Sequence, residues 1–425
     1  MSARPRHGSF GGLEAGTAPV GSRRHKPDYW ILILGSLLLG IGLVVVYSIS
    51  PALSASQKTS QSYFVIKQLV DVALGVVAFL VASSIPIGKW KLLVKPLVLA
   101  AIVGSLVVMV TPINTAYPAH RWIRLGSFSF QIAELIKLAL LVGLASFLTA
   151  KWRSGQLADS KKTLYPLLGL LLILGVVVAK LQSDLGSMGV MVIIMGAMAF
   201  TVGVPLKKIA LIGSAVLVLL ALSVSTSAYR RQRLTTFLHP QSNCQNSGYQ
   251  ACQALISVGS GGVAGLGLGY SVQAYGYLPE ASNDSIFAII AEKLGFIGTV
   301  AILALYAIFI TRLKRIIEHT ADQFYRLLVV GVMAWLSTQM IINVCAMIGL
   351  LPLKGITLPL ISQGGTSLVF LTAALGLVFH ISRYTSYSVT EPKTAVNETP
   401  ITSNSHERGR LGRPYNATIV TRPRT

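Results

Sequence analysis

Residues 248–298 have the sequence GYQACQALISVGSGGVAGLGLGYSVQAYGYLPEASNDSIFAIIAEKLGFIG, in which a glycine-rich half precedes an apolar half. Glycines permit tight backbone paths that other residues resist. The apolar half opens a run at 285–311 that is long enough to cross a bilayer as a helix. This stretch therefore predicts a glycine-rich connection that leads directly into a transmembrane segment.

The composition of the whole chain is that of a membrane protein. Of its 425 residues, 53% are hydrophobic and only 12% are charged, which is too apolar for a soluble globular chain. Runs long enough to span a bilayer cover 29–50, 64–84, 92–111, 130–150, 163–181, 186–203, 207–227, 285–311, 325–350 and 365–386. We therefore expect an all-α integral membrane protein with about ten transmembrane helices and a large extracytoplasmic loop, at 228–284, between helices 7 and 8.

The distribution of charge indicates an orientation. The formal net charge is +22, and much of it lies in the two tails, which favours anionic lipid headgroups over nucleic acid as the partner. Lys and Arg also gather in the short connections of one side, which the positive-inside rule places in the cytoplasm. We expect a multi-pass protein of the cytoplasmic (inner) membrane with both termini cytoplasmic. The predicted parts are a disordered tail at 1–28, a membrane domain at 29–387 and a disordered basic tail at 388–425.

Two outer connections carry arginines on the side that is otherwise poor in basic residues. Arg121 and Arg124 flank Trp122 in one, and Arg231 belongs to a basic group at 230–233 in the other. A tryptophan and arginines at a membrane edge can serve as interfacial anchors alone. Alternatively, these cations have an anionic partner, which would make them part of a binding site.

Two further pairs place charge or polarity inside or beside apolar runs. Glu134 and Lys137 are three residues apart, so they lie on one helical face and can pair within the membrane, where ionisable groups mark an inner cavity. Gln182 and Asp184 precede a glycine between two apolar runs. They are either a solvated turn or a second side of the same cavity.

The most specific acidic group lies just before the apolar run at 285–311. Glu280 and Asp284 precede it, so Asp284 is near the amino end of a helix, where the helix dipole favours a carboxylate. Asp284 could be an N-cap and nothing more. Glu292 follows eight residues later on nearly the same face, and we expect it to point inward below Asp284.

The region 343–368 combines apolar residues with helix breakers. Pro352, Pro359 and a glycine pair at 364–365 interrupt the run, and lipid tolerates irregular backbone only against protein or a water-filled cavity. We expect this segment to re-enter the membrane. Lys354 within it could meet a phosphate or could simply face the headgroups.

Cysteine and histidine usage adds two expectations. Cys244 and Cys252 both lie on the predicted outer loop and could form a disulfide in an oxidising compartment. The seven histidines make no ligand cluster with the acids, so the sequence indicates no metal site.

In this order, the four blocks at 121–137, 180–190, 230–298 and 343–368 resemble the SEDS family (shape, elongation, division and sporulation). The resemblance covers about residues 29–387 and is most specific at 248–298. The sequence SVQ followed by YLPE leans toward the cell-division branch of the family. Departures include Ile132 and Ala133 in place of proline and serine, and Gln363 in place of tyrosine.

This resemblance implies a peptidoglycan glycosyltransferase that polymerises lipid II at the outer face of the membrane during cell division. The implied partners are a class B penicillin-binding protein, other divisome proteins and membrane lipids. The released product would be undecaprenyl pyrophosphate. The reaction needs no cofactor, although a divalent cation could bridge the pyrophosphate.

The family's essential aspartate matches Asp284, which we take as the catalytic base. The remaining candidates are substrate-binding residues, and they include the matches to the family's arginine–tryptophan, glutamate–lysine and second acidic motifs. They are Arg121, Trp122, Arg124, Glu134, Lys137, Gln182, Asp184, Arg231, Gln253, Glu280 and Lys354.

Two other functions suit part of the pattern. A transporter of the lipid-linked precursor (a flippase) would also use intramembrane charges and broken helices, but its decisive charges belong near the bilayer midplane, and the chain shows no internal repeat. A non-catalytic divisome scaffold would use the tails, but it has no need for a Glu134–Lys137 pair.

Overall fold

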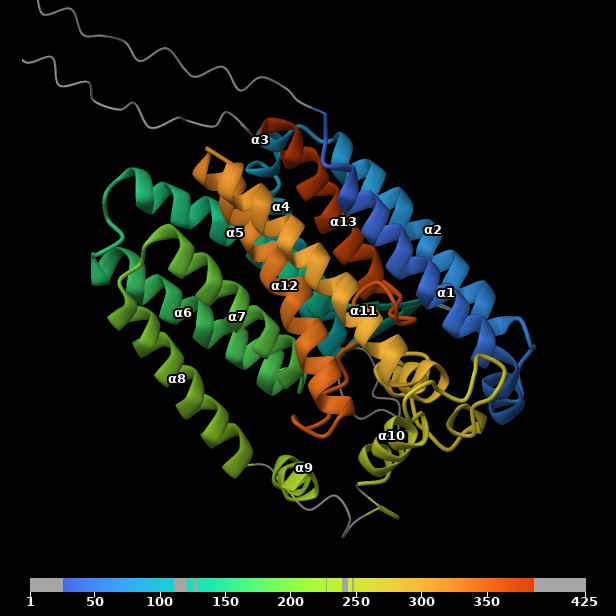
Figure 1. Ribbon diagram of the computed structural model, residues 1–425. Helices are drawn as coiled ribbons and strands as arrows, with labels where there is room; N and C mark the ends of the chain where they lie inside the picture. The colour runs from blue at the N-terminus through green and yellow to red at the C-terminus, as the bar shows by residue number, and fades with distance from the viewer. Residues whose placement is uncertain are drawn as a thin grey trace, which may run out of the picture. The chain divides into compact units, whose positions relative to one another are not determined.

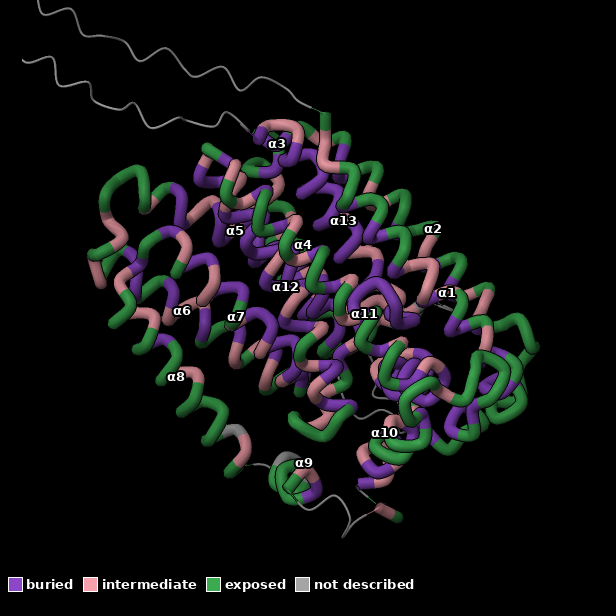
Figure 2. The backbone as a smooth tube through the Cα atoms, in the orientation of Figure 1, coloured by how far each residue is buried: buried purple, intermediate pink, exposed green. Residues whose placement is uncertain are grey.

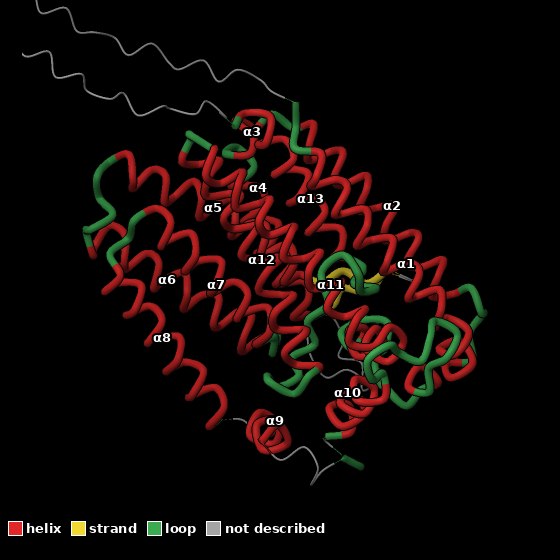
Figure 3. Tube along the Cα trace, in the orientation of Figure 1, coloured by secondary structure: helices red, strands yellow, loops and turns green. Residues whose placement is uncertain are grey.

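The computed structural model describes residues 26–110, 121–125, 128–226, 228–238, 244–246 and 248–385. The chain divides into two units, 1–386 and 387–425, and the second lies outside the described residues. Nearly all of the predicted tails at 1–28 and 388–425 lies outside them too. The described part of the first unit is dominated by helices (Figures 1 and 3).

The helices are α1 (Tyr29–Gln57), α2 (Tyr63–Ser84), α3 (Ile87–Trp90), α4 (Val94–Val110), α5 (Ile132–Arg153), α6 (Tyr165–Leu174), α7 (Leu185–Val202), α8 (Leu206–Ser225), α9 (Ala228–Leu238), α10 (Tyr249–Ser260), α11 (Ile286–His319), α12 (Gln323–Met347) and α13 (Thr366–Ile381). Two π-helical segments, Ser160–Leu164 and Gly175–Leu181, extend α6 at its two ends. Short 3-10 turns lie at Gln273–Tyr275 and Ser382–Tyr384.

The predicted all-α membrane fold is confirmed. Each of the ten expected ranges contains a helix, and eight helical spans among the described residues are long and apolar enough to cross a membrane. The ranges of α4, which has 17 residues, and α8 are not among those eight. The count of ten transmembrane helices therefore stays a prediction.

A small sheet precedes α5, and the sequence analysis did not predict it. Strand β1 (Trp122–Leu125) pairs antiparallel with β2 (Phe128–Gln131), with Trp122 opposite Gln131. Phe128 and Phe130 lie just before the apolar residues of α5, so hydropathy alone extended the predicted helix back to 130. The helix begins instead at Ile132, directly after the strand.

Helices α5, α12 and α13 form the most buried part of the described fold (Figure 2). Helix α7 packs against α12, and α2 packs along α13. Gly331 lets α5 and α12 approach closely, because a Cβ there would lie 2.2 Å from Leu141 Cδ1. These close contacts fix the relative positions of the helices that carry the polar residues.

The glycine-rich part of the connection between α10 and α11 is built into a break in α11. Gly295 has φ +63° and ψ −164° inside this helix. The amides of Leu266 and Gly267 donate to the carbonyls of Glu292 and Lys293, each at 2.9 Å. In return, the amides of Phe296 and Ile297 donate to the Gly262 and Val263 carbonyls at 2.9 and 3.1 Å. Glycine is needed for this approach, since a Cβ at Gly265 would lie 2.2 Å from the Lys293 oxygen.

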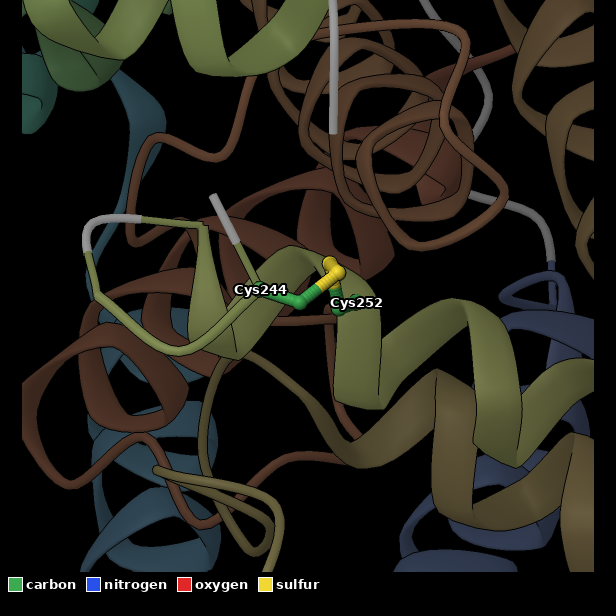
Figure 4. The surroundings of a disulfide bond; sticks show 2 residues. All are labelled: Cys244 and Cys252. Carbon is green, nitrogen blue, oxygen red and sulfur yellow. A yellow bond between two sulfur atoms is a disulfide. The ribbon is translucent and has the colours of Figure 1, made fainter. Parts of the chain in front are cut away.

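A disulfide joins Cys244 to Cys252, with 5.6 Å between their Cα atoms (Figure 4). Cys252 lies on α10, which packs against the start of α11, where the Ser257 hydroxyl donates to the Ala288 carbonyl at 2.9 Å. The bond therefore ties the chain before α10 to α10 itself, which packs against the start of α11.

Candidate active site

Asp284 lies immediately before α11, beside the segment between α12 and α13. The N-cap of α11 is Ser285, so Asp284 is not simply the cap of this helix. A Cβ built on Gly355 would lie 3.6 Å from Asp284 Oδ2, which places the carboxylate against the backbone at 355. The Asn343 side-chain amide donates to the carbonyls of both Asp284 and Ile356 at 2.7 Å. One amide of α12 thus holds the acid and this segment together.

The segment at 348–365 has the irregular backbone that its prolines and glycines predicted. It contains no helix, and its apolar residues at 356, 358, 360 and 361 are buried. The Tyr306 hydroxyl of α11 donates to the Pro359 carbonyl, and a Cβ on Gly42 of α1 would lie 2.5 Å from the Ile361 oxygen. The irregular backbone is therefore packed against protein, as lipid requires.

Arg121 and Asp184 stabilise the polar turn at 182–184, just before α7. The Arg121 guanidinium donates from Nε to the Gln182 carbonyl at 3.0 Å and from a second nitrogen to the Ser183 carbonyl. Asp184 caps α7 by accepting from the Ser187 amide at 3.0 Å and hydroxyl at 2.9 Å. It also accepts from Gln131 Nε2 at 3.1 Å. The turn at 182–184 therefore links the strand pair before α5 to α7.

Gly186, in the first turn of α7, connects this turn to the Asp284 region. A Cβ at this position would lie 3.1 Å from the Lys354 oxygen and 2.9 Å from Ile356 Cγ1. Residues 354–356 therefore lie between the start of α7 on one side and Asp284 on the other. Parts of all four predicted blocks therefore contact one another near the starts of α5, α7 and α11 and the end of α12.

The predicted pairing of Glu134 and Lys137 is confirmed. Lys137 Nζ lies 2.7 Å from Glu134 Oε1, and the two side chains are only 1% and 3% exposed, respectively. Lys137 Nζ also lies 5.4 Å from the centre of the Trp335 ring on α12. Buried charges persist only when paired, so this pair fixes two opposite charges inside the helix bundle.

Other candidates are placed differently. Trp122 is partly exposed on β1, Gln253 is half-buried on α10, and Glu280 and Arg231 are exposed. The Asn283 amide donates to Glu280 at 2.5 Å, within the turn before α11. The Arg124 side chain lies outside the described residues.

Glu292 fastens the connection between α10 and α11. Its carboxylate accepts from the Ser271 hydroxyl at 2.6 Å and from the amides of Val272 and Gln273 at 2.9 and 3.3 Å. Glu292 is 1% exposed, so it points inward as expected. Its role as a buried anchor of the loop was not predicted, because nothing local to Glu292 in the sequence indicates which distant amides reach it.

The sequence analysis assigned no role to several residues that organise the site. Asn343 lay within a recognised block, but only the fold shows that it binds the Asp284 carbonyl. Gln363 was noted only as a departure from the family's usual tyrosine. Its backbone amide donates to the Ser282 carbonyl at 2.9 Å, and its side-chain amide donates to the Phe64 carbonyl at 2.7 Å. The spacing of Trp335, Gln339 and Asn343 at four-residue intervals on α12 was the available signal for Asn343.

This fold and site define a multi-pass membrane protein with a charged polar site where several helices begin. The chain belongs to the FTSW_RODA_SPOVE family, described as "Cell cycle protein", which matches residues 29–387. It is 35% identical over 373 residues to the "Stage V sporulation protein E" of Bacillus subtilis, covering 86% of this chain and 100% of that protein. It is 37% identical over 362 residues to the "Probable peptidoglycan glycosyltransferase FtsW" of Coxiella burnetii, covering 84% and 96%.

Two solved structures are similar to this chain over most of its length. A chain from "Structural coordination of polymerization and crosslinking by a peptidoglycan synthase complex" has a TM-score of 0.65 and 25% identity, covering 84% of this chain and 98% of that one. The crystal structure of the Thermus thermophilus rod shape determining protein RodA has a TM-score of 0.59 and 25% identity, covering 84% and 97%.

Proposed function

We propose that this protein is a peptidoglycan glycosyltransferase that polymerises lipid II at the outer face of the cytoplasmic membrane during cell division. The observation that best supports this function is that Asp284 lies next to the segment that carries Lys354, and that this segment also packs against the start of α7, beside the turn that binds Arg121. The names of relatives such as the Coxiella burnetii protein support the same reaction.

The reaction joins a hydroxyl of one lipid-linked disaccharide to the anomeric carbon of another and releases undecaprenyl pyrophosphate. The donor already carries a good leaving group, so an inverting displacement needs a base and positive charge rather than a covalent enzyme intermediate. Asp284 takes the hydroxyl proton as the new glycosidic bond forms. Its position beside Gly355 puts the base next to the segment that carries Lys354.

Positive charge for the pyrophosphate comes from Arg121 and Lys354. Arg121 uses two N–H groups on the carbonyls of Gln182 and Ser183, and a guanidinium has five N–H donors in all, so it can be held in place while it also binds a phosphate. Lys137 is buried and paired with Glu134, so it acts on the pyrophosphate from inside the helix bundle and not by direct exposed contact. A divalent cation bridging the pyrophosphate remains compatible with this arrangement.

A class B penicillin-binding protein is the proposed partner, because the similar chain of known structure comes from a peptidoglycan synthase complex. The proposed outward placement of the loop before α11 is supported by its disulfide, since such bonds persist in oxidising compartments. Other divisome proteins and anionic lipids would meet the tails.

The test is polymerisation of labelled lipid II by the purified full-length protein in proteoliposomes, with and without the penicillin-binding partner. Asp284→Asn should abolish glycan formation and leave the yield and melting temperature of the protein unchanged. Asp159→Asn is the matched control, because Asp159 caps the π-helical segment at Ser160 and asparagine caps nearly as well. Glycan synthesis by Asp284→Asn at the normal rate, or lipid II translocation without polymerisation, would overturn the proposal.

A further inference from the structure

Helix α12 carries a buried polar face. Trp335, Gln339 and Asn343 are spaced four residues apart, so they lie on one side of the helix at steps of about 6 Å. Their exposed fractions are 0%, 1% and 1%. Polar side chains buried at three successive turns of α12 need a physical reason, because burial of polar groups is unfavourable without partners.

The two ends of this face are fixed by charged parts of the site. At one end, the Trp335 ring lies 5.4 Å from Lys137 Nζ. At the other end, Asn343 donates to the Asp284 carbonyl at 2.7 Å. The polar face of α12 therefore runs from the Glu134–Lys137 pair to the proposed catalytic base.

Helix α5 runs antiparallel along the same face. Leu141 meets the position of Gly331, and Lys137 meets Trp335 one turn further along. One more turn in the same direction brings Glu134 to the level of Gln339. The line between the two helices is thus bordered by polar groups from both sides.

Four residues on this line each have a buried polar atom that makes no hydrogen bond within the part of the chain that the structure describes. The atoms are Trp335 Nε1, Gln339 Oε1, Asn343 Oδ1 and Glu134 Oε2. Buried polar atoms nearly always have a partner, and ordered water supplies it where protein does not. Four such atoms along the line between α5 and α12 are suited to a run of hydrogen-bonded water molecules.

We propose that Trp335, Gln339 and Asn343 line a file of ordered water that joins the Glu134–Lys137 pair to the residue holding Asp284, and that Gln339 is the positioning residue that anchors this water. The functional part of the inference rests on the proposed glycosyltransferase activity. Water held in this way keeps the ion pair and the Asn343 amide in one hydrogen-bonded network. Gln339 touches no substrate, so its loss should act on the catalytic step rather than on binding.

Hydroxyl-radical footprinting of the full-length protein in nanodiscs tests the water directly. Radicals generated from water modify side chains next to bound water even when bulk solvent cannot reach them. Trp335 should be labelled faster than Phe324, another fully buried aromatic residue of α12, after correction for intrinsic reactivity. Gln339→Met should reduce labelling of Trp335 to the level of Phe324. Labelling of wild-type Trp335 no faster than Phe324 would overturn the proposal.

Kinetics of lipid II polymerisation test the positioning role. Gln339→Met keeps the volume and removes the acceptor, so it should lower kcat by about tenfold and leave KM unchanged. Gln339→Asn keeps the amide and should recover most of the rate. Ser337→Ala is the control, since Ser337 bonds only within its own helix, to the Met333 and Ala334 carbonyls.

The water file, the positioning role of Gln339 and the proposed glycosyltransferase activity can each be disproved separately. Normal kcat in Gln339→Met with the protein correctly folded would sink the positioning role. If Trp335 is labelled as expected but the wild-type protein polymerises no lipid II with its partner present, the water file stands and the proposed function fails.

Discussion

The side-chain amide of Asn343 donates to the backbone carbonyl of Asp284 at 2.7 Å, across 59 residues of sequence. The same nitrogen donates to the Ile356 carbonyl at 2.7 Å. A single buried amide thus joins the end of α12, the irregular segment at 348–365 and the start of α11. The backbone of the proposed base is therefore held to α12 as well as to the start of α11.

Replacement of Asn343 by leucine should therefore impair catalysis. The change introduces an apolar side chain of similar size and leaves two carbonyls without their donor. We expect the rate of lipid II polymerisation to fall by about tenfold or more. Thr311→Val, which removes an exposed hydroxyl of α11 bonded to the Ile308 carbonyl, should polymerise normally. An unchanged rate in Asn343→Leu would show that Asp284 is held by other contacts.

The buried pair of Glu134 and Lys137 should show strong coupling in a double-mutant cycle. Glu134→Gln or Lys137→Met alone leaves one charge buried without its partner, which costs about 3–5 kcal/mol. The double variant removes both charges and should be more stable than either single variant. Thermal unfolding in a fixed detergent measures all four proteins. Strictly additive losses would argue against a direct interaction in the folded protein.

Gly295 should not tolerate alanine. Its φ of +63° disfavours any L side chain, and a Cβ would lie 2.3 Å from the Gly265 nitrogen. We expect Gly295→Ala to cost more than about 1 kcal/mol and to speed hydrogen exchange at the amides of Leu266 and Gly267. Gly40→Ala, in the open face of α1 where a Cβ meets nothing within 4 Å, should be neutral or slightly stabilising. Equal behaviour of the two variants would contradict this account of the break in α11.

Loss of the disulfide should loosen the outer loop. We expect Cys244→Ser, or reduction of the wild-type protein, to lower stability by about 2 kcal/mol, as for other short loops closed by a disulfide. Thermal unfolding with and without reductant measures the effect, and Cys345→Ser is the control because Cys345 is a free thiol. A reductant-insensitive melting temperature would show that α10 is held by packing alone.

The positions of the helices were largely predictable, because the hydropathy that indicates a membrane-spanning helix is read from one continuous run of residues. The ten apolar ranges each contain a helix, and the Glu134–Lys137 pair follows from a spacing of three on one of them. The strand at 128–131 was missed for the same reason, since its apolar residues continue into α5. Local pattern alone cannot separate a short strand from a neighbouring helix end.

The sequence by itself determined that this chain lives in a membrane, where its helices run and which charged residues are unusual, since all of these depend on residues near one another along the chain. Only the tertiary structure decided that Asn343 holds Asp284, that Arg121 binds the carbonyls before α7 and that Glu292 anchors the loop. Those contacts join parts of the chain far apart in sequence. They depend on how closely helices pack, which is set by glycines and side-chain shapes on both surfaces at once.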